Sequence, residues 1–256
     1  MTFEVIDGIR FHRQELGAKA PIDAVPVVML HGLLTGSLAS WYLTCAPTLA
    51  RARRVVLYDQ RGHGQTDVTP NGYGSHEQAA DLDALTTDLA PFALVGHSFG
   101  ALVAARFAVA RPERVRALAL VEPPLGSRLP TPTDRGGVTD VDEWLTAAGA
   151  DPASLPRRQR DRIRKLLTTT ALRAELAVEP PFTDDDIARL PRPVVVVFGN
   201  RSPLARVAAS VRTALPDARV AVLDGGHALQ VDARDELAGL LTEFLASVDA
   251  APVAYG

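Results

Sequence analysis

Mainly apolar runs alternate with stretches of helical periodicity along the first half of the chain. The apolar runs are residues 25–30, 53–58, 92–95 and 115–121, and the helical patterns are residues 38–50, 75–89 and 101–110. Continuously apolar runs are typical of strands that are buried on both faces of a parallel sheet. We therefore predict an α/β fold with a mostly parallel, doubly wound sheet, and a ligand site at the carboxyl ends of its strands.

The N-terminal segment has a different pattern. Apolar and polar residues alternate through residues 3–7 and 9–16, on either side of Gly8. This period of two is typical of strands with one exposed face, so we expect an antiparallel hairpin at the edge of the sheet. Farther along, Ser37 is expected to cap the helix predicted at 38–50.

The alternation of strands and helices stops between Glu122 and Leu190. Prolines occupy positions 123, 124, 130 and 132, and short helical patterns follow at 141–148, 157–168, 171–177 and 184–190. This segment is too long for an ordinary loop. We predict a core domain of residues 1–122 and 191–256, with residues 123–190 inserted as a helical cap. In the second part of the core, strands are expected at 193–199 and 219–223, and helices at 203–215 and 236–248.

Composition excludes several classes of protein. The 256 residues are 47% hydrophobic and 22% charged, as in an ordinary globular protein, and the formal net charge of −3 gives no general attraction to nucleic acid or anionic membranes. The single cysteine, Cys45, excludes an internal disulfide and a multi-cysteine metal site, and its apolar setting favours core packing. No apolar run approaches membrane-spanning length, and residues 1–5 lack the features of a secretory signal, so we expect a cytoplasmic protein.

A Gly-x-Ser-x-Gly motif lies where a predicted strand meets a predicted helix. Residues 96–100 follow the apolar run 92–95 and precede a helical pattern. In that setting the motif forms a nucleophile elbow, a tight turn that exposes the serine, here Ser98, and leaves no room for side chains at the two glycines. A serine hydroxyl also needs a base. His227 is the best placed of six histidines, because it follows the last predicted strand and two glycines; a loop histidine without a catalytic role is the alternative.

Four motifs follow one another along the chain. They are His31-Gly32, Asp59-x-Arg61-Gly62-x-Gly64, Gly96-x-Ser98-x-Gly100 and Gly226-His227. Their order resembles that of the α/β-hydrolase superfamily, in particular its capped, cofactor-free serine hydrolases, over about residues 3–248. The resemblance implies no cofactor and no metal. It also implies an oxyanion hole formed by the backbone N–H groups of Phe99 and Leu33.

The acid that the resemblance leads us to expect is missing from its usual position. Family members usually carry a Gly-x-x-Asp arrangement after the strand that follows the cap, whereas this chain ends the same four residues with Ser202. Serine cannot supply the carboxylate that orients His227. Glu122 is the predicted replacement, because it follows the strand after the elbow, where related hydrolases place their acid. In the alternative interpretation, Glu122 instead binds an arginine or loop amides. Asp224 is a weaker candidate for the acid, because it is expected to point away from His227.

Other residues are predicted to shape the site. We expect His31, Trp144 and Phe182 to contact a small-molecule substrate, with core packing as an equal alternative for the two aromatic residues. His31, His63 and His97 lie in family motifs and are expected to position other groups rather than transfer protons. Residues 157–165 contain six basic side chains, which could attract an anionic substrate or the acidic surface of an acyl-carrying protein; a solvated helix face is the alternative.

Two functional hypotheses follow from these residues. The first is a serine hydrolase that cleaves an ester, thioester or lactone of a small hydrophobic molecule through an acyl-enzyme on Ser98. The second is a non-hydrolytic protein of the same fold, such as a cyclase, a lyase or a binding module. Hydrolysis of a C–C bond also stays open, because a fold does not determine the reaction. Serine at the elbow argues against the epoxide-hydrolase and haloalkane-dehalogenase branches, which use aspartate there.

Overall fold

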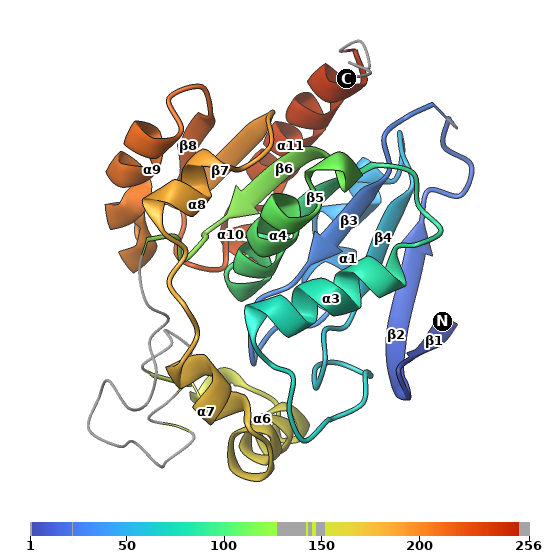
Figure 1. Ribbon diagram of the computed structural model, residues 1–256, viewed down its shortest axis with the longest axis vertical. Helices are drawn as coiled ribbons and strands as arrows, with labels where there is room; N and C mark the ends of the chain where they lie inside the picture. The colour runs from blue at the N-terminus through green and yellow to red at the C-terminus, as the bar shows by residue number, and fades with distance from the viewer. Residues whose placement is uncertain (1, 22, 127–141, 143–144, 147–151, 251–256) are drawn as a thin grey trace.

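An eight-stranded sheet forms the centre of the computed structural model, which describes residues 2–21, 23–126, 142, 145, 146 and 152–250 (Figure 1). The strand order is β1-β2-β4-β3-β5-β6-β7-β8. The strands are β1 (Thr2–Ile6), β2 (Ile9–Leu16), β3 (Val27–Leu30), β4 (Val55–Tyr58), β5 (Phe92–His97), β6 (Val115–Val121), β7 (Val194–Gly199) and β8 (Arg219–Leu223). Strand β2 pairs antiparallel with β1 and β4, and all other pairs are parallel. The predicted parallel sheet and edge hairpin are confirmed.

Helices cover both faces of this sheet (Figure 1). The α-helices are α1 (Ala39–Tyr42), α2 (Ala46–Leu49), α3 (Ser75–Leu85), α4 (Phe99–Ala110), α6 (Arg157–Thr169), α7 (Leu172–Ala177), α8 (Asp184–Ala188), α9 (Ala208–Ala214), α10 (Leu229–Asp232) and α11 (Arg234–Asp249). Val28 and Leu30 of β3 pack in the core layer that contains α3 and α4, while Val27 and Met29 pack in the layer that contains α1, α2 and α11. Because successive side chains of a strand point to opposite faces, an uninterrupted apolar run fills both layers.

Several predicted helices differ in the structure. The helix expected at 75–89 ends at Leu85, and the one expected at 101–110 begins at Phe99. The helix expected at 38–50 is divided into α1 and α2, because the ring of Pro47 would clash with the carbonyl of Leu43 in a continuous helix. Ser37 makes no side-chain capping bond there, and Leu38 takes the cap position. The helix expected at 203–215 begins as the 3₁₀ turn Pro203–Val207, and α11 starts two residues earlier than predicted.

Among the described residues of the segment predicted as a cap, the regular elements are helices joined by turns and coil, and α6 and α7 lie below the sheet in Figure 1. Side chains of α6 contact the loops that follow β3 and β4. The carboxylate of Glu175 on α7 accepts the N–H groups of Gly72 and Tyr73 at 3.0 and 2.6 Å. Helix α8 instead packs beside α9. The helix expected at 141–148 lies mostly outside the described residues, and the division into core and cap stays a prediction.

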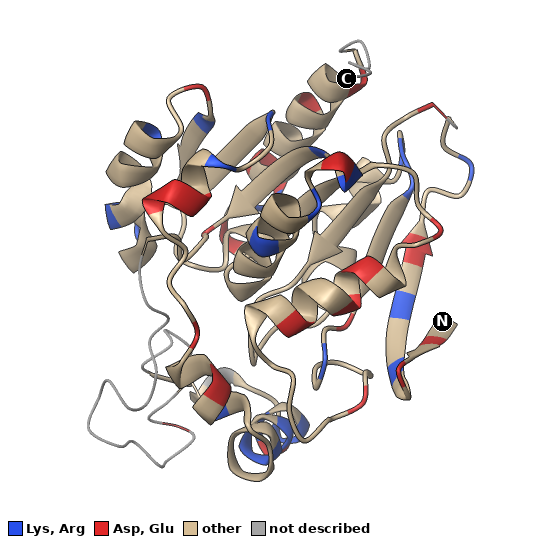
Figure 2. Cartoon of the chain, viewed as in Figure 1, with Lys and Arg blue, Asp and Glu red and all other residues tan. Residues whose placement is uncertain are grey.

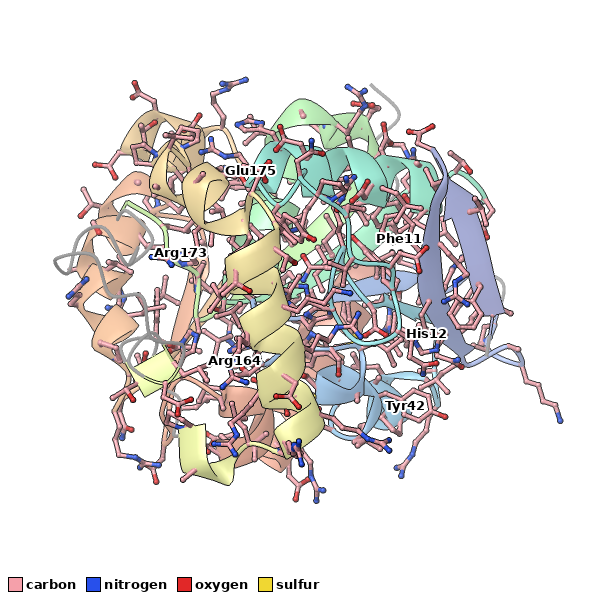
Figure 3. The ribbon with its side chains drawn as sticks, turned by 90° about the horizontal axis from the view of Figure 1, so that it is seen from below. Phe11, His12, Tyr42, Arg164, Arg173 and Glu175 are labelled. Carbon is pink, nitrogen blue, oxygen red and sulfur yellow. The ribbon has the colours of Figure 1, made fainter. Side chains whose placement is uncertain are left out.

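Helix α6 carries a basic outer surface (Figures 2 and 3). The Arg157 side chain is 90% exposed and that of Arg164 is 55% exposed, and Asp161 lies within ion-pair distance of both. Arg158 and Lys165 are also exposed. The inner side of the same helix is apolar, with Ile163, Leu166 and Leu167 buried. No helix among the described residues is long and apolar enough to cross a membrane.

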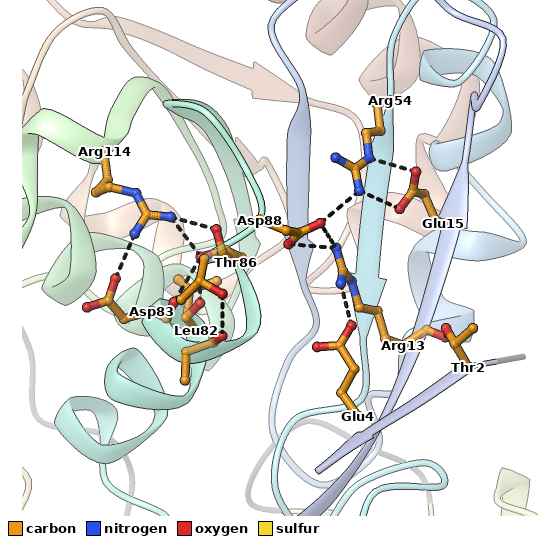
Figure 4. A network of polar contacts seen from close by, with 12 residues as sticks. Thr2, Glu4, Arg13, Glu15, Arg54, Leu82, Asp83, Thr86, Asp88 and Arg114 are labelled. Atoms are coloured by element: carbon orange, nitrogen blue, oxygen red, sulfur yellow. Dashed lines mark hydrogen bonds and ion pairs between the residues drawn. The ribbon is translucent and has the colours of Figure 1, made fainter. Parts of the chain in front are cut away.

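A network of ion pairs secures the antiparallel edge of the sheet (Figure 4). Arg13 of β2 pairs with Glu4 of β1 and with Asp88, which follows α3. Arg54 pairs with the same Asp88 at 3.0 Å and with Glu15 at 2.6 Å. Single exposed ion pairs contribute little to stability, but shared partners join the hairpin to the parallel part of the sheet.

Candidate active site

Ser98 lies on a sharp turn between β5 and α4. Its backbone has φ 53° and ψ −121°, a region that residues with a side chain rarely adopt. Its N–H group donates to the carbonyl of Val121 at 2.9 Å, which anchors the turn to β6. A Cβ on Gly96 would lie 2.4 Å from the Gly100 oxygen, and a Cβ on Gly100 would lie 2.4 Å from the His31 oxygen. Sterics therefore require glycine at both positions.

Two hydrogen bonds connect Ser98, His227 and Glu122. The Nε2 atom of His227 lies 2.9 Å from Ser98 Oγ, and its Nδ1 atom lies 2.9 Å from Glu122 Oε2. A carboxylate can only accept, so Nδ1 carries the hydrogen and Nε2 presents a lone pair to the Ser98 hydroxyl. This geometry is suited to removing the serine proton and to stabilising the imidazolium that results.

Glu122 is completely buried at the end of β6. Its backbone has φ 53°, and its N–H group donates to the carbonyl of Val197 at 2.8 Å. The Oε1 atom accepts the N–H group of Gly199 at 2.6 Å. The Oε2 atom is a partner of both His227 Nδ1 and the Ser202 hydroxyl. Since burying a carboxylate is costly without donors, these three contacts explain how Glu122 can be buried.

Ser202 stands where the resemblance leads us to expect an acid, and it is 7% exposed. Its hydroxyl donates to Glu122, and its oxygen accepts the N–H group of Leu204 at 3.1 Å. The sequence shows only that an acid is missing at this position and does not predict the hydrogen bond to Glu122. The signal that could have suggested it is a serine, which can donate a hydrogen bond, in the place of the acid. The carboxylate of Asp224 instead forms an exposed ion pair with Arg201.

The two predicted oxyanion donors come from separate loops. Phe99 is the first residue of α4, immediately after Ser98. Leu33 follows Gly32, where an added Cβ would lie 3.3 Å from Ser98 Cβ, so this loop passes close to the serine. Within the described part of the chain, neither N–H group donates to another residue. Their role as oxyanion donors stays a prediction.

His31 and His97 are buried beside the site, and burial lowers the pKa of His31 and lowers that of His97 to about 3. His31 Nε2 accepts the N–H group of Gln60 at 3.0 Å, so its Nδ1 donates to the Gly32 carbonyl at 2.8 Å. His97 Nε2 lies 2.7 Å from the carbonyl oxygen of His227, to which it donates. Both rings hold neighbouring backbone in place, and the expected contact between His31 and substrate stays a prediction.

The two aromatic residues expected beneath the cap have different outcomes. Trp144 lies outside the described residues. Phe182 is 1% exposed, and the Arg106 guanidinium lies 5.0 Å from the centre of its ring. Its carbonyl accepts the N–H group of Gly126 at 2.9 Å. Phe182 therefore packs in the interior, and its contact with substrate stays a prediction.

A metal site or a reactive thiol would be another kind of reactive centre in the described part of the chain. The described residues contain no group of three or more His, Cys, Asp or Glu side chains that could hold a metal ion. Cys45 is fully buried, and burial raises the pKa of its thiol to about 12. It packs as an apolar core residue.

The order of the strands and the sharp turn at Ser98 agree with the hydrolase fold that the sequence motifs resemble. The chain belongs to the alpha/beta hydrolase fold family, whose sequence profile matches residues 25–175. It is 30% identical to RutD of Cronobacter sakazakii, which carries the name of a carbamate hydrolase, over 92% of this chain and 96% of the relative.

Two further comparisons extend over nearly the whole chain. The 2-hydroxymuconate semialdehyde hydrolase of a Pseudomonas species is 28% identical, over 96% of this chain and 94% of its own length. The solved enol-lactonase of Burkholderia xenovorans superposes with a TM-score of 0.73 at 18% identity, over 96% of this chain and 100% of that one. The structural likeness shows the fold, while the named relatives mark this chain as a hydrolase.

Proposed function

We propose that the protein is a serine hydrolase that cleaves an ester, thioester or lactone of a small hydrophobic molecule. The observation that carries this proposal is the continuous chain of hydrogen bonds from Ser98 through His227 to Glu122. A base in contact with the hydroxyl, and a buried carboxylate behind that base, are the parts that serine-based acyl transfer requires.

In the proposed reaction, Ser98 Oγ bonds to the substrate carbonyl carbon while its proton moves to His227 Nε2. The carbonyl oxygen becomes an oxyanion and accepts hydrogen bonds from the N–H groups of Phe99 and Leu33. His227 then gives its proton to the leaving oxygen or sulfur atom as the bond to carbon breaks. Water attacks the acyl-enzyme with His227 again as the base, which releases the acid and restores the Ser98 hydroxyl.

The class of bond that is cleaved stays open within the family. The relatives' names include a carbamate hydrolase and a hydrolase of a semialdehyde, so they favour no single acyl group. A C–C bond hydrolase is the alternative. A panel of p-nitrophenyl esters, lactones and acyl thioesters separates the hydrolytic options by kcat/KM.

The nucleophile can be tested without knowing the natural substrate. A fluorophosphonate probe is expected to attach to Ser98, as located by mass spectrometry, and labelling is expected to disappear in His227→Ala because the hydroxyl then lacks its base. His76→Ala provides a matched control, since His76 is exposed on α3. An unlabelled Ser98 in the folded wild-type protein would contradict the proposal.

A further inference from the structure

The loop after β3 contains a tight turn at Leu34. The N–H group of Thr35 donates to the Leu33 carbonyl at 2.8 Å, and Leu34 between them has φ 61°. A bond between residues two apart, with positive φ at the centre, forms a γ-turn of the rare and strained kind. The turn begins at Leu33, the residue whose N–H group is a predicted oxyanion donor. Other contacts must stabilise the turn, because leucine does not favour that conformation by itself.

His63 makes the buried contact that holds the turn. Its Nε2 atom accepts the N–H group of Leu34 at 2.8 Å, and its Nδ1 atom donates to the Arg61 carbonyl at 2.8 Å. The ring centre lies 5.2 Å from that of His31. Burial, together with the nearby His31, lowers the pKa of His63 to about 3. The ring is therefore neutral near pH 7, and Nε2 stays available as an acceptor.

Helix α6 in turn holds the loop that carries His63. Arg162 donates to the carbonyl groups of Gly62, His63 and Thr66 at 2.9, 3.1 and 2.7 Å. Its guanidinium is thus bound by backbone carbonyls. These three bonds link α6 to the segment after β4, on which the contact between His63 and Leu34 depends.

A second contact from α6 reaches the turn itself. The Nε2 atom of Gln159 donates to the Thr35 carbonyl at 2.8 Å. This bond is exposed to solvent, so it adds less than the buried bond to His63. Both contacts act on the residues that follow Leu33.

We propose that His63 is the positioning residue for the Leu33 N–H donor, and that α6 holds His63 in place through Arg162. This inference rests on the proposed function, because it takes the Leu33 N–H group as an oxyanion donor. The effect of His63 falls on the charged transition state rather than on substrate binding, since an oxyanion donor matters most when charge has developed. His63 acts on the site through its hydrogen bond to the backbone N–H group of Leu34.

The test compares His63→Phe with His76→Phe. Phenylalanine fills the space of the imidazole but cannot accept the Leu34 N–H group, whereas His76 is exposed on α3. For an active p-nitrophenyl ester, His63→Phe is expected to lower kcat about tenfold and to leave KM within twofold, below the 10²–10³ loss seen when an oxyanion donor is removed outright. Inhibition by an arylboronic acid, whose adduct with Ser98 mimics the tetrahedral intermediate, is expected to weaken by a similar factor.

Two further variants keep the inference testable if His63→Phe does not fold. His63→Gln offers an amide oxygen to the Leu34 N–H group and is expected to recover part of both losses. Arg162→Met is expected to weaken boronic acid inhibition about threefold at unchanged KM. Unchanged inhibition in the folded variants would overturn the positioning role while fluorophosphonate labelling of the wild type upholds the proposed function. An unlabelled wild-type Ser98 would overturn both.

Discussion

At the residue scale, the orientation of His227 depends on the carboxylate of Glu122. Within the described residues, it is the carboxylate that pairs with His227. We predict that Glu122→Gln lowers kcat by about ten-thousandfold, because an amide cannot stabilise the imidazolium and can select the wrong tautomer. The measurement is steady-state kcat on the best ester of the panel, with circular dichroism to confirm folding. Near-wild-type turnover would reject Glu122 as the acid.

Ser202 offers a complementary test of the same histidine. Its hydroxyl already contacts the oxygen of Glu122 that faces His227, so a carboxylate at this position could reach the same Nδ1 atom. In the Glu122→Gln background, Ser202→Asp is expected to restore at least a tenth of the lost activity, whereas Ser202→Asn, which is similar in size but uncharged, is expected to restore none. Equal activity in the two double variants would contradict this prediction.

The sequence predicted which side chains meet, but not all of the contacts that hold them. Ser98 and His227 could be found because each follows a recognisable strand, and parallel strands end at one edge of a sheet. Glu122 could be found because the family resemblance also allows an acid after the strand that follows the elbow. The bond from Ser202 to Glu122 and the bond from His97 to the His227 carbonyl join residues far apart in sequence. No local pattern encodes such contacts, so they needed the structure.

At the scale of elements, the strands were predictable and some helices were not. Strand β6 has the predicted bounds because an apolar run that fills two core layers leaves little freedom of register. The prediction of one continuous helix at 38–50 is wrong. Its periodic pattern continues through Pro47, but the proline ring breaks the helix there. Helix α10 has four residues, too few to show a helical period.

The basic surface of α6 carries a prediction about substrate delivery. If the acyl group arrives on an acidic carrier protein, the double change Arg158→Glu and Arg164→Glu is expected to lower kcat/KM for that substrate about tenfold and to reduce its salt dependence. The kcat/KM for a small p-nitrophenyl ester is expected to stay unchanged. Arg212→Glu, on α9 and away from α6 in Figure 1, is the matched control. Equal losses for both substrates would contradict a docking role.

At the scale of the whole molecule, the site is built where the sheet, its loops and α6 converge, and buried neutral histidines join these parts. His97 connects β5 to the backbone of His227, and His63 connects the loop after β4 to the loop after β3. Burial lowers the pKa of both rings to about 3, against an ordinary value of 6.5. The same histidines therefore link the geometry of the site to the pH dependence of folding.

The lowered pKa values of these two histidines determine whether acid raises or lowers the free energy of unfolding. Between about pH 6.5 and pH 3, the unfolded chain binds protons at His63 and His97 that the folded chain does not, so the free energy of unfolding falls as the pH falls. Each such histidine contributes a slope of up to ~1.4 kcal/mol per pH unit in that window. Above it the effect disappears, because both states are then neutral.

Urea unfolding at several values between pH 7 and pH 4.5 checks this prediction. Carboxylates also respond to acid, so the informative quantity is the difference between variants that share them. His97→Gln, which keeps an N–H donor for the His227 carbonyl, is expected to flatten the slope of unfolding free energy against pH by up to ~1.4 kcal/mol per unit. His76→Gln, on the exposed face of α3, is expected to leave the slope as in the wild type. The same slope in both variants would show that His97 takes up its proton in the folded state as readily as in the unfolded chain.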